Sequence, residues 1–130
     1  MSNEARRLQV DRFILAQIDS VPHLEALLLL FKSRPKAWSI DEMADSLYVH
    51  DEVASKILDG LLQCNLIAAS SDAAEACFYI PDNTTSGRLL EDVDAAYRKQ
   101  MVRIASLIHS KGSGGLRDFA RAFRIRKDRT

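Results

Sequence analysis

The side chains that most often bind metals are widely spaced in this chain. They are His23, His50, Cys64, Cys77 and His109. Metal sites need such ligands at short, regular spacing, as in HExxH or paired CxxC motifs, and neither motif occurs here. The sequence therefore predicts no metal site, no cofactor and no disulfide framework. Two isolated cysteines are typical of a reducing compartment, and we expect a cytoplasmic protein.

Carboxylates gather at two neighbouring points of the sequence. Asp41, Glu42 and Asp45 form the first group, and Asp51 with Glu52 forms the second. Paired carboxylates can act as general acid and general base. However, the helix dipole attracts acidic side chains to the first turn of a helix, and both groups stand where a helix is expected to begin. We interpret them as helix-start residues and predict that the chain is not an enzyme.

A glycine-rich stretch, residues 112–115, lies near the C-terminal end. A phosphate-binding loop needs the GxxxxGK[ST] pattern after a strand, and this stretch has neither. Because Gly112, Gly114 and Gly115 lower helix propensity, we expect them to end a helix and to form a hinge.

The segment that follows the glycines is basic and amphipathic. Its apolar residues stand at three- and four-residue steps and share one face of a short helix: Leu116, Phe119, Ala120 and Phe123. Its basic residues are Arg117, Arg121, Arg124, Arg126, Lys127 and Arg129. Aromatic residues interleaved with arginines favour a docking segment, while a solvated charged end is the alternative.

The net charge of the chain is zero, with 18 basic and 18 acidic residues. Its two parts differ, because residues 1–81 hold seven Lys/Arg against twelve Asp/Glu, and residues 82–130 hold eleven against six. These counts give net charges of −5 and +5. No global field therefore draws the whole protein to nucleic acid or to a membrane, but the basic part is typical of an interaction segment.

Apolar residues at helical spacing predict amphipathic helices over residues 5–18, 22–32, 40–47 and 50–64. The expected buried residues are Val10, Phe13, Ile14 and Ile18 in the first, Leu24, Leu27, Leu28 and Phe31 in the second, Ile40, Met43, Ala44 and Leu47 in the third, and Val53, Ile57, Leu58 and Leu61 in the fourth. The longest apolar run is far shorter than the roughly 20 residues of a membrane span, so no membrane is expected as a partner.

Local signals set the ends of two of these helices. Ser39 and Glu42 have the spacing of a capping box, which begins a helix at Ile40. Asn65 tolerates the left-handed conformation that often ends a helix, so the fourth helix is expected to stop there. The apolar runs 66–68 and 77–80, with a small polar loop between them, predict a β-hairpin.

A second apolar stripe indicates one long helix over residues 86–111, which would be about 39 Å long at 1.5 Å per residue. The stripe consists of Leu90, Val93, Tyr97, Met101, Ile104 and Ile108. A helix of this length extends beyond a small domain, so we expect the stripe to pair with a second copy as a homodimer interface. The alternative is that it covers the helix-turn-helix with its hairpin, residues 22–81.

The whole pattern predicts a mainly α fold with a small β-hairpin. The expected parts are an N-terminal helix over residues 1–21, a helix-turn-helix with a hairpin over 22–81, a long dimerisation helix over 82–111, and a hinge with a basic tail over 112–130.

The central part resembles a known family. Residues 38–49 read Trp-Ser-Ile-Asp-Glu-Met-Ala-Asp-Ser-Leu-Tyr-Val, and a second helix, the sequence Asn65-Leu66-Ile67 and a hairpin follow. This order resembles bacterial winged-helix regulators of the MarR-like kind over about sixty residues. Residues 18–25 and 118–124 are similar to a group of short bacterial proteins. The resemblance implies a winged helix-turn-helix in which the strand before residue 40 and the Asn-Leu-Ile sequence determine the fold.

The resemblance also implies that the exposed side of the 50–64 helix faces DNA. The exposed residues there are His50, Asp51, Glu52, Ser55, Lys56 and Asp59. The candidate DNA-contacting residues are His50, Ser55 and Lys56, together with Lys32, Arg34 and Lys36 in the preceding turn and the basic tail. DNA affinity depends on cations that neutralise phosphates, so three carboxylates on this helix predict weak, salt-sensitive binding.

Two functions are consistent with these observations. The first is a homodimeric winged-helix transcription regulator with weak DNA binding. The second is a winged-helix module that binds no DNA and docks a basic protein partner on its acidic face.

Overall fold

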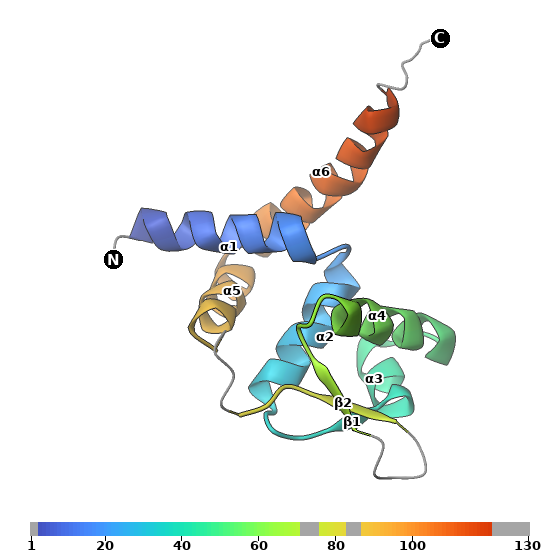
Figure 1. Ribbon diagram of the computed structural model, residues 1–130. Coiled ribbons are helices and arrows are strands. Elements are labelled where there is room, and N and C mark those ends of the chain that lie inside the picture. Colours follow the sequence, from blue (N-terminus) through green and yellow to red (C-terminus); the bar gives the residue numbers. More distant parts are fainter. Residues whose placement is uncertain (1–2, 71–75, 83–86, 121–130) are drawn as a thin grey trace. The chain divides into compact units, whose positions relative to one another are not determined.

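The computed structural model describes residues 3–70, 76–82 and 87–120, with side chains from Glu4 to Ser110 within these ranges. Within these ranges the chain forms six helices and three short strands (Figure 1). The helices are α1 (Asn3–Gln17), α2 (Val21–Lys32), α3 (Ile40–Leu47), α4 (Asp51–Gln63), α5 (Gly87–Lys99) and α6 (Met101–Ala120), and the strands are β1 (Trp38–Ser39), β2 (Ala68–Ser70) and β3 (Cys77–Tyr79). The fold is mainly α with a β-hairpin, as predicted.

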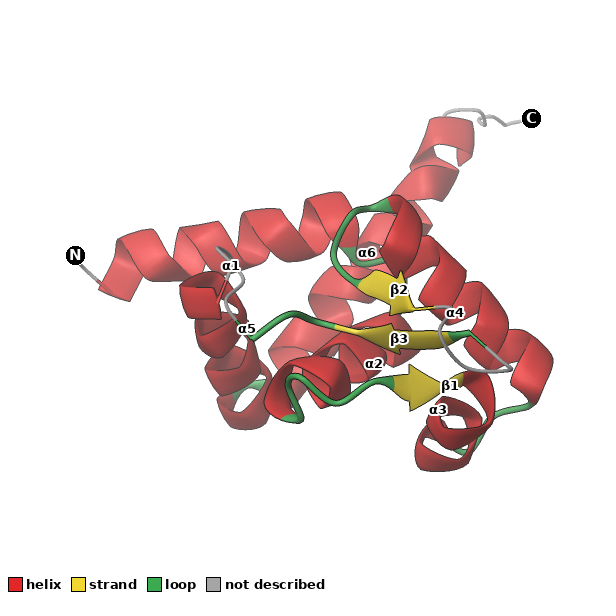
Figure 2. Ribbon diagram, turned by 60° about the horizontal axis from the view of Figure 1, so that its bottom comes forward, coloured by secondary structure: helices red, strands yellow, loops and turns green. Residues whose placement is uncertain are grey.

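The chain divides into two compact units. The winged-helix unit is Val21–Asp94, and the helical unit combines Met1–Ser20 with Ala95–Thr130. In the winged-helix unit, β3 lies between β1 and β2, and both pairings are antiparallel (Figure 2). The hairpin of β2 and β3 pairs Ala68 with Tyr79 and Ser70 with Cys77. The strand before α3, which the resemblance implied, is β1.

In the winged-helix unit, α2 packs against α3 and α4. Their fully buried large side chains include Leu24, Leu27, Leu30, Met43, Leu58 and Leu61. Helices α2 and α4 approach closely at Gly60, where an added Cβ would lie 3.2 Å from Nε2 of His23. A larger residue at this position would require the His23 side chain to move by a few tenths of an ångström.

Both predicted helix-end signals are confirmed. The Ser39 hydroxyl accepts the amide of Glu42 at 3.1 Å, and the Ser39 amide donates to the Glu42 carboxylate at 3.0 Å. Asn65 has φ 60°, immediately after Cys64 caps α4. The amide of Leu66 then bonds the carbonyl of Leu61 at 3.0 Å, which closes the end of the helix.

One predicted core position of α4 is wrong. Val53 is 41% exposed, and Ala54 is fully buried in its place, together with Ile57, Leu58 and Leu61. These four stand at steps of three, one and three residues, which defines one side of a helix. Val53 lies one residue outside that pattern, so it points outward. Phe13, Ile40 and Leu47 were also predicted to be buried and are half-buried.

In the helical unit, α1 packs against α6. Nη1 of Arg103 lies 3.2 Å from both carboxylate oxygens of Asp11, and Nε of Arg103 donates to Gln100 at 2.9 Å. This pair joins residues 92 positions apart in the sequence, and both side chains are half-buried. Because charged hydrogen bonds are directional and apolar contacts are not, this pair fixes which residues of α1 and α6 lie side by side.

The predicted single helix over residues 86–111 is interrupted at Gln100, between α5 and α6. Helical hydrogen bonds still cross this point, because the Gln100 amide bonds Ala96 at 2.8 Å and the Gln100 carbonyl accepts from Ile104 at 3.0 Å. The sequence did not predict the interruption, because no glycine or proline stands there and the apolar spacing continues through Gln100.

The predicted hinge at Gly112, Gly114 and Gly115 is also wrong, because α6 continues through these residues to Ala120. Glycine inside a helix costs only about 1 kcal/mol relative to alanine, which neighbouring helical residues can offset. The side chains of 111–120 and all of 121–130 lie outside the described part. The predicted apolar face of the tail, at Leu116, Phe119, Ala120 and Phe123, therefore stays a prediction.

Candidate binding face of the helix-turn-helix

The turn between α3 and α4 holds an exposed aromatic residue in an unusual conformation. Tyr48 caps α3 with φ 58° and ψ 45°, and it is 94% exposed. Asn or Gly normally takes this left-handed region, because a Cβ there meets the backbone. The amide of Val49 bonds the carbonyl of Ala44 at 3.0 Å, so the turn is held by backbone bonds. No sequence signal indicated that Tyr48 would adopt it.

His50, one of the predicted DNA contacts, is the N-cap residue of helix α4. His50 is exposed and extended at the N-cap, where its side chain makes no capping bond and its carbonyl accepts the amides of Val53 and Ala54 at 3.0 Å each. Lys56 is exposed and Ser55 is half-buried. All three therefore lie on or beside the outward side of the helix, as predicted.

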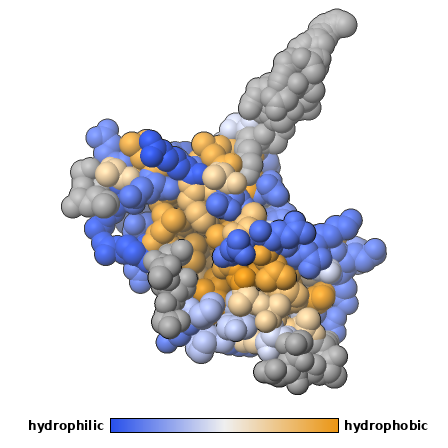
Figure 3. Space-filling model, in the orientation of Figure 1, coloured by the Kyte–Doolittle hydropathy of each residue, from blue (hydrophilic) through white to orange (hydrophobic). Residues whose placement is uncertain are grey.

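Carboxylates surround these residues. Asp41 and Asp45 of α3, and Asp51, Glu52 and Asp59 of α4, are all exposed. Figure 3 shows hydrophilic residues gathered over α4. Within the described residues, no ion pair joins any of these carboxylates to a Lys or Arg side chain. We call the set Asp41, Asp45, Tyr48, Asp51, Glu52 and Val53 the acidic face.

The carboxylates of the acidic face act on one another. Protonated Asp51 donates a hydrogen bond to the neighbouring Asp41 carboxylate, and the negative charges of Asp41 and Asp45 also favour the protonated form. Together they raise the pKa of Asp51 above its usual value, which His50 only partly offsets. Because α3 and α4 bring these groups together from positions ten residues apart, the sequence did not reveal their interaction. The result is a surface whose negative charges repel one another.

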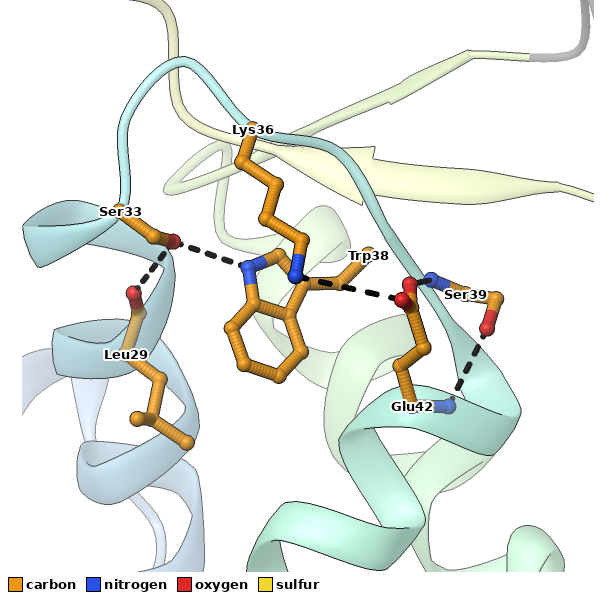
Figure 4. Close-up of polar contacts among 6 residues, drawn as sticks. All are labelled: Leu29, Ser33, Lys36, Trp38, Ser39 and Glu42. Carbon is orange, nitrogen blue, oxygen red and sulfur yellow. Dashed lines mark hydrogen bonds and ion pairs between the residues drawn. The ribbon is translucent and has the colours of Figure 1, made fainter.

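The cations expected to bind DNA in the turn between α2 and β1 have partners within the chain. Nζ of Lys36 lies 4.3 Å from the centre of the Trp38 ring and 3.9 Å from Glu42 (Figure 4). Trp38 in turn donates to the Ser33 hydroxyl at 2.9 Å, and that hydroxyl donates to the Leu29 carbonyl at 2.7 Å. Glu42 thus serves both the capping box and the pair with Lys36.

The other two cations of this turn are held in a similar way. Arg34 donates through Nε to the Phe31 carbonyl at 2.8 Å, and its guanidinium lies 3.9 Å from the centre of the Phe31 ring. Nζ of Lys32 lies 3.5 Å from the carboxylate of Asp94, which is buried. The predicted set of Lys32, Arg34 and Lys36 is therefore brought together in space, but each member is engaged by the chain itself.

The predicted dimer stripe is mostly covered by the chain. Leu90, Val93, Tyr97, Ile104 and Ile108 are buried, whereas Met101 is 54% exposed. These five side chains are therefore not exposed to a second copy of the chain. Among the described side chains of the helical unit, the exposed large apolar residues are Leu8, Leu15, Met101 and Val102. The predicted basic side chains of the tail, Arg117, Arg121, Arg124, Arg126, Lys127 and Arg129, lie outside the described part.

No protein-family model matches the sequence, and no curated protein matches it significantly. Solved structures do match. MepR of Staphylococcus aureus, in a complex with DNA, aligns with a TM-score of 0.56 at 17% identity, over 85% of this chain and 92% of MepR. A MarR family protein from Bacillus stearothermophilus aligns with a TM-score of 0.51 at 16% identity, over 93% and 81%.

The fold is that of a MarR-like winged helix. The heme sensor PefR of Streptococcus agalactiae, in complex with heme, supports the same assignment with a TM-score of 0.54 at 16% identity, over 95% of this chain and 94% of PefR. These alignments cover most of each chain, so the MarR-like winged helix includes the flanking helices as well as the central module. At such low identity they establish the fold alone.

In the part of the chain that the structure describes, no three His, Cys, Asp or Glu side chains are grouped so that they could hold a metal ion. No single described helix is long and apolar enough to cross a membrane, although α1 and α2 taken together across their bend reach that length and composition.

Proposed function

We propose that this protein is a winged-helix transcription regulator that acts as a homodimer. The observation that supports this proposal is the arrangement of α3, the Tyr48 turn, α4 and the β2–β3 hairpin, which is the arrangement of the regulator MepR, solved in a complex with DNA. In helix-turn-helix proteins the second helix enters the major groove. Helix α4 is the element that would do so here.

DNA binding by this surface is weak and salt-sensitive in our proposal. Lys56 faces outward among carboxylates, and the cations of residues 32–36 are already partly neutralised. Little cationic charge therefore remains for phosphates, apart from the basic tail. The dissociation constant for random duplexes should be on the order of 10⁻⁵ M, within the range of non-specific binding.

Fluorescence anisotropy of the full chain with labelled random duplexes tests this proposal. We expect binding at about 0.05 M salt that falls steeply by about 0.2 M, and selection from random sequences should return no sharp palindrome. A sharp palindrome would show that base reading is stronger than proposed. If the chain did not bind DNA at the lower salt concentration, the proposal that it is a transcription regulator would be wrong.

The homodimer is proposed to form through the exposed apolar residues of the helical unit. Val102 is 79% exposed and Met101 is 54% exposed, and Leu8 and Leu15 of α1 are exposed as well. Leaving such side chains in water forgoes roughly 1.5 to 3 kcal/mol of burial each. The buried stripe is a poor place to test dimerisation, because a charge at Tyr97 or Ile104 would disturb the fold first.

Sedimentation distinguishes a dimer from a monomer at about 30 μM, where weak dimers persist. The wild-type chain should sediment as a dimer, and Val102→Glu should be monomeric. Ser106→Glu is the control, because Ser106 is an exposed polar position of the same helix. A monomeric wild-type chain would contradict the dimer.

A second function, docking of a basic protein partner, is favoured by the acidic face. Its mutually repelling carboxylates oppose phosphate and attract cations. Capture of an oligo-lysine peptide by the wild-type chain, lost in the double variant Asp51→Lys/Glu52→Lys, would support this function. Equal capture by both proteins would exclude the acidic face as the docking surface.

A further inference from the structure

The start of α4 is the part of the winged-helix unit that DNA would approach most closely. In helix-turn-helix proteins, residues at the N-terminal end of the second helix contact the base edges. Here that end consists of the N-cap residue His50 and the first helical residues Asp51 and Glu52, and all three are exposed. The charge of these side chains therefore acts directly on the phosphates of a bound duplex.

Two of these side chains respond to protons and to each other. The hydrogen bond that protonated Asp51 donates to the Asp41 carboxylate, and then the charges of Asp41 and Asp45, raise the pKa of Asp51. Cationic His50 acts in the opposite sense and lowers it. The His50 side chain makes no capping bond to α4, so its ring remains accessible at the exposed N-cap. A proton taken up by either residue makes the start of α4 less negative.

The surroundings of this turn are otherwise acidic. The titratable and charged groups around His50 and Asp51 are Asp41 and Asp45 of α3, Tyr48 of the following turn, and Glu52 and Lys56 of α4. Helix α2 also packs on α4, but its His23 lies beside Gly60, nine positions after Asp51. Four exposed carboxylates, those of Asp41, Asp45, Asp51 and Glu52, therefore share this turn with His50.

We propose that protonation of His50 and Asp51 strengthens DNA binding by α4, so that the affinity for DNA rises as the pH falls from about 7.5 to about 5.5. This inference rests on the proposed DNA binding and adds its regulation. Histidine gains positive charge over this range, whereas DNA phosphates keep their negative charge. Protonation of Asp51 removes one of the four negative charges at the same place. Both changes therefore favour the bound state.

Fluorescence anisotropy of the full chain with a labelled random duplex tests the proposal. At about 0.05 M salt, one additional phosphate contact raises the affinity roughly tenfold, because affinity varies with salt to about the −0.9 power per contact. His50 and Asp51 are each protonated in part of the molecules. We therefore expect a dissociation constant at least about fivefold lower at about pH 5.5 than at about pH 7.5.

Two single variants, their combination and one control assign the effect to these groups. Because cationic His50 opposes protonation of Asp51, His50→Gln and Asp51→Asn should each keep part of the gain in affinity. Asp51→Asn should also bind more tightly than the wild type at about pH 7.5. In the double variant His50→Gln/Asp51→Asn the gain should fall below about 1.5-fold. His109→Gln, which removes an exposed histidine of the helical unit, should keep the wild-type gain.

The outcomes separate this regulation from the function on which it rests. Equal affinity of the wild-type chain at the two pH values would overturn the proposal, and so would a full gain in the double variant. Either result would leave DNA binding itself in place. If the chain bound the duplex at neither pH, the proposed DNA binding would be wrong, and its regulation with it.

Discussion

Two neighbouring regions of the winged-helix unit differ in whether their charged side chains have partners of opposite charge or other favourable contacts. In the turn of residues 32–38, each cation has a partner: Lys32 has Asp94, Arg34 has the Phe31 ring and carbonyl, and Lys36 has Trp38 and Glu42. On the acidic face, the neighbouring groups of Asp51 are the carboxylates of Asp41 and Asp45, which repel its negative charge. The turn is therefore a structural element whose charges contribute to the fold. The acidic face keeps its charge available for whatever binds there.

The comparison implies that substitutions in the turn change stability and that substitutions on the acidic face change binding. Trp38→Ala should have the largest effect on stability, because Trp38 packs under Lys36 and bonds Ser33. We expect a loss of about 2 kcal/mol in the free energy of unfolding, below the full core value because Trp38 is half-buried. Urea denaturation followed by circular dichroism measures it.

Trp38→Phe is the matched control for that change. It keeps an aromatic ring under Lys36 and removes only the indole donor, so it should cost about 1 kcal/mol. A loss below about 0.5 kcal/mol for Trp38→Ala would mean that the turn is not the structural element described here.

Ser39→Ala should have a smaller effect of about 1 kcal/mol, because it removes one half of the capping box at the start of α3. Ser46→Ala, at an exposed position of the same helix, should leave the free energy of unfolding nearly unchanged. Thermal unfolding of both variants beside the wild type checks the difference. Equal effects would show that the cap makes no special contribution.

Asp41→Asn should produce the smallest effect, a lowering of the pKa of Asp51. The Asp41 carboxyl is the main cause of the raised pKa of Asp51, so its neutralisation restores a more usual value. Carboxyl NMR titration measures the pKa directly. Asp59→Asn, farther along α4, should leave it unchanged, and an unchanged pKa in Asp41→Asn would contradict the coupling.

The same coupling sets a pH dependence. A raised pKa in the folded chain means that Asp51 takes up its proton at a higher pH than it does in the unfolded chain. Protonation of Asp51 therefore stabilises the folded chain, and this contribution is fully present below the pKa that Asp51 has in the unfolded chain. It is lost as the pH rises through the higher pKa of the folded chain. The repulsion is present at neutral pH, where a basic partner would relieve it.

Much of the fold could be predicted because its signals are local. The capping box at Ser39 and the left-handed Asn65 depend on residues within a few positions of each other, and the apolar steps of α2 fix its buried side. The break at Gln100 and the helical Gly112 could not be predicted in this way. No glycine or proline stands at the break, and each glycine in α6 costs only about 1 kcal/mol in helix propensity, so the local residue types indicate the opposite of what the structure shows in both places.

The candidate site was predicted less well than the fold. Exposure of His50 and Lys56 followed from their place on the helix, but the partners of Lys32 and Arg34 come from spatial contacts. Lys32 meets Asp94, which is 62 positions away in the sequence, so no motif connects them. The coupling of Asp41 with Asp51 likewise needs the α3–α4 turn to bring them together.

The central claim is that the carboxylates of α4 limit what this winged helix binds. The affinity of the full chain for a random duplex, measured at about 0.05 M salt for the wild type and for the triple variant Asp51→Asn/Glu52→Gln/Asp59→Asn, tests it most directly. Removing three negative charges from the side of α4 that would face phosphates should tighten binding at least about tenfold, which corresponds to about 1.4 kcal/mol. An unchanged or weaker affinity in the triple variant would contradict the claim.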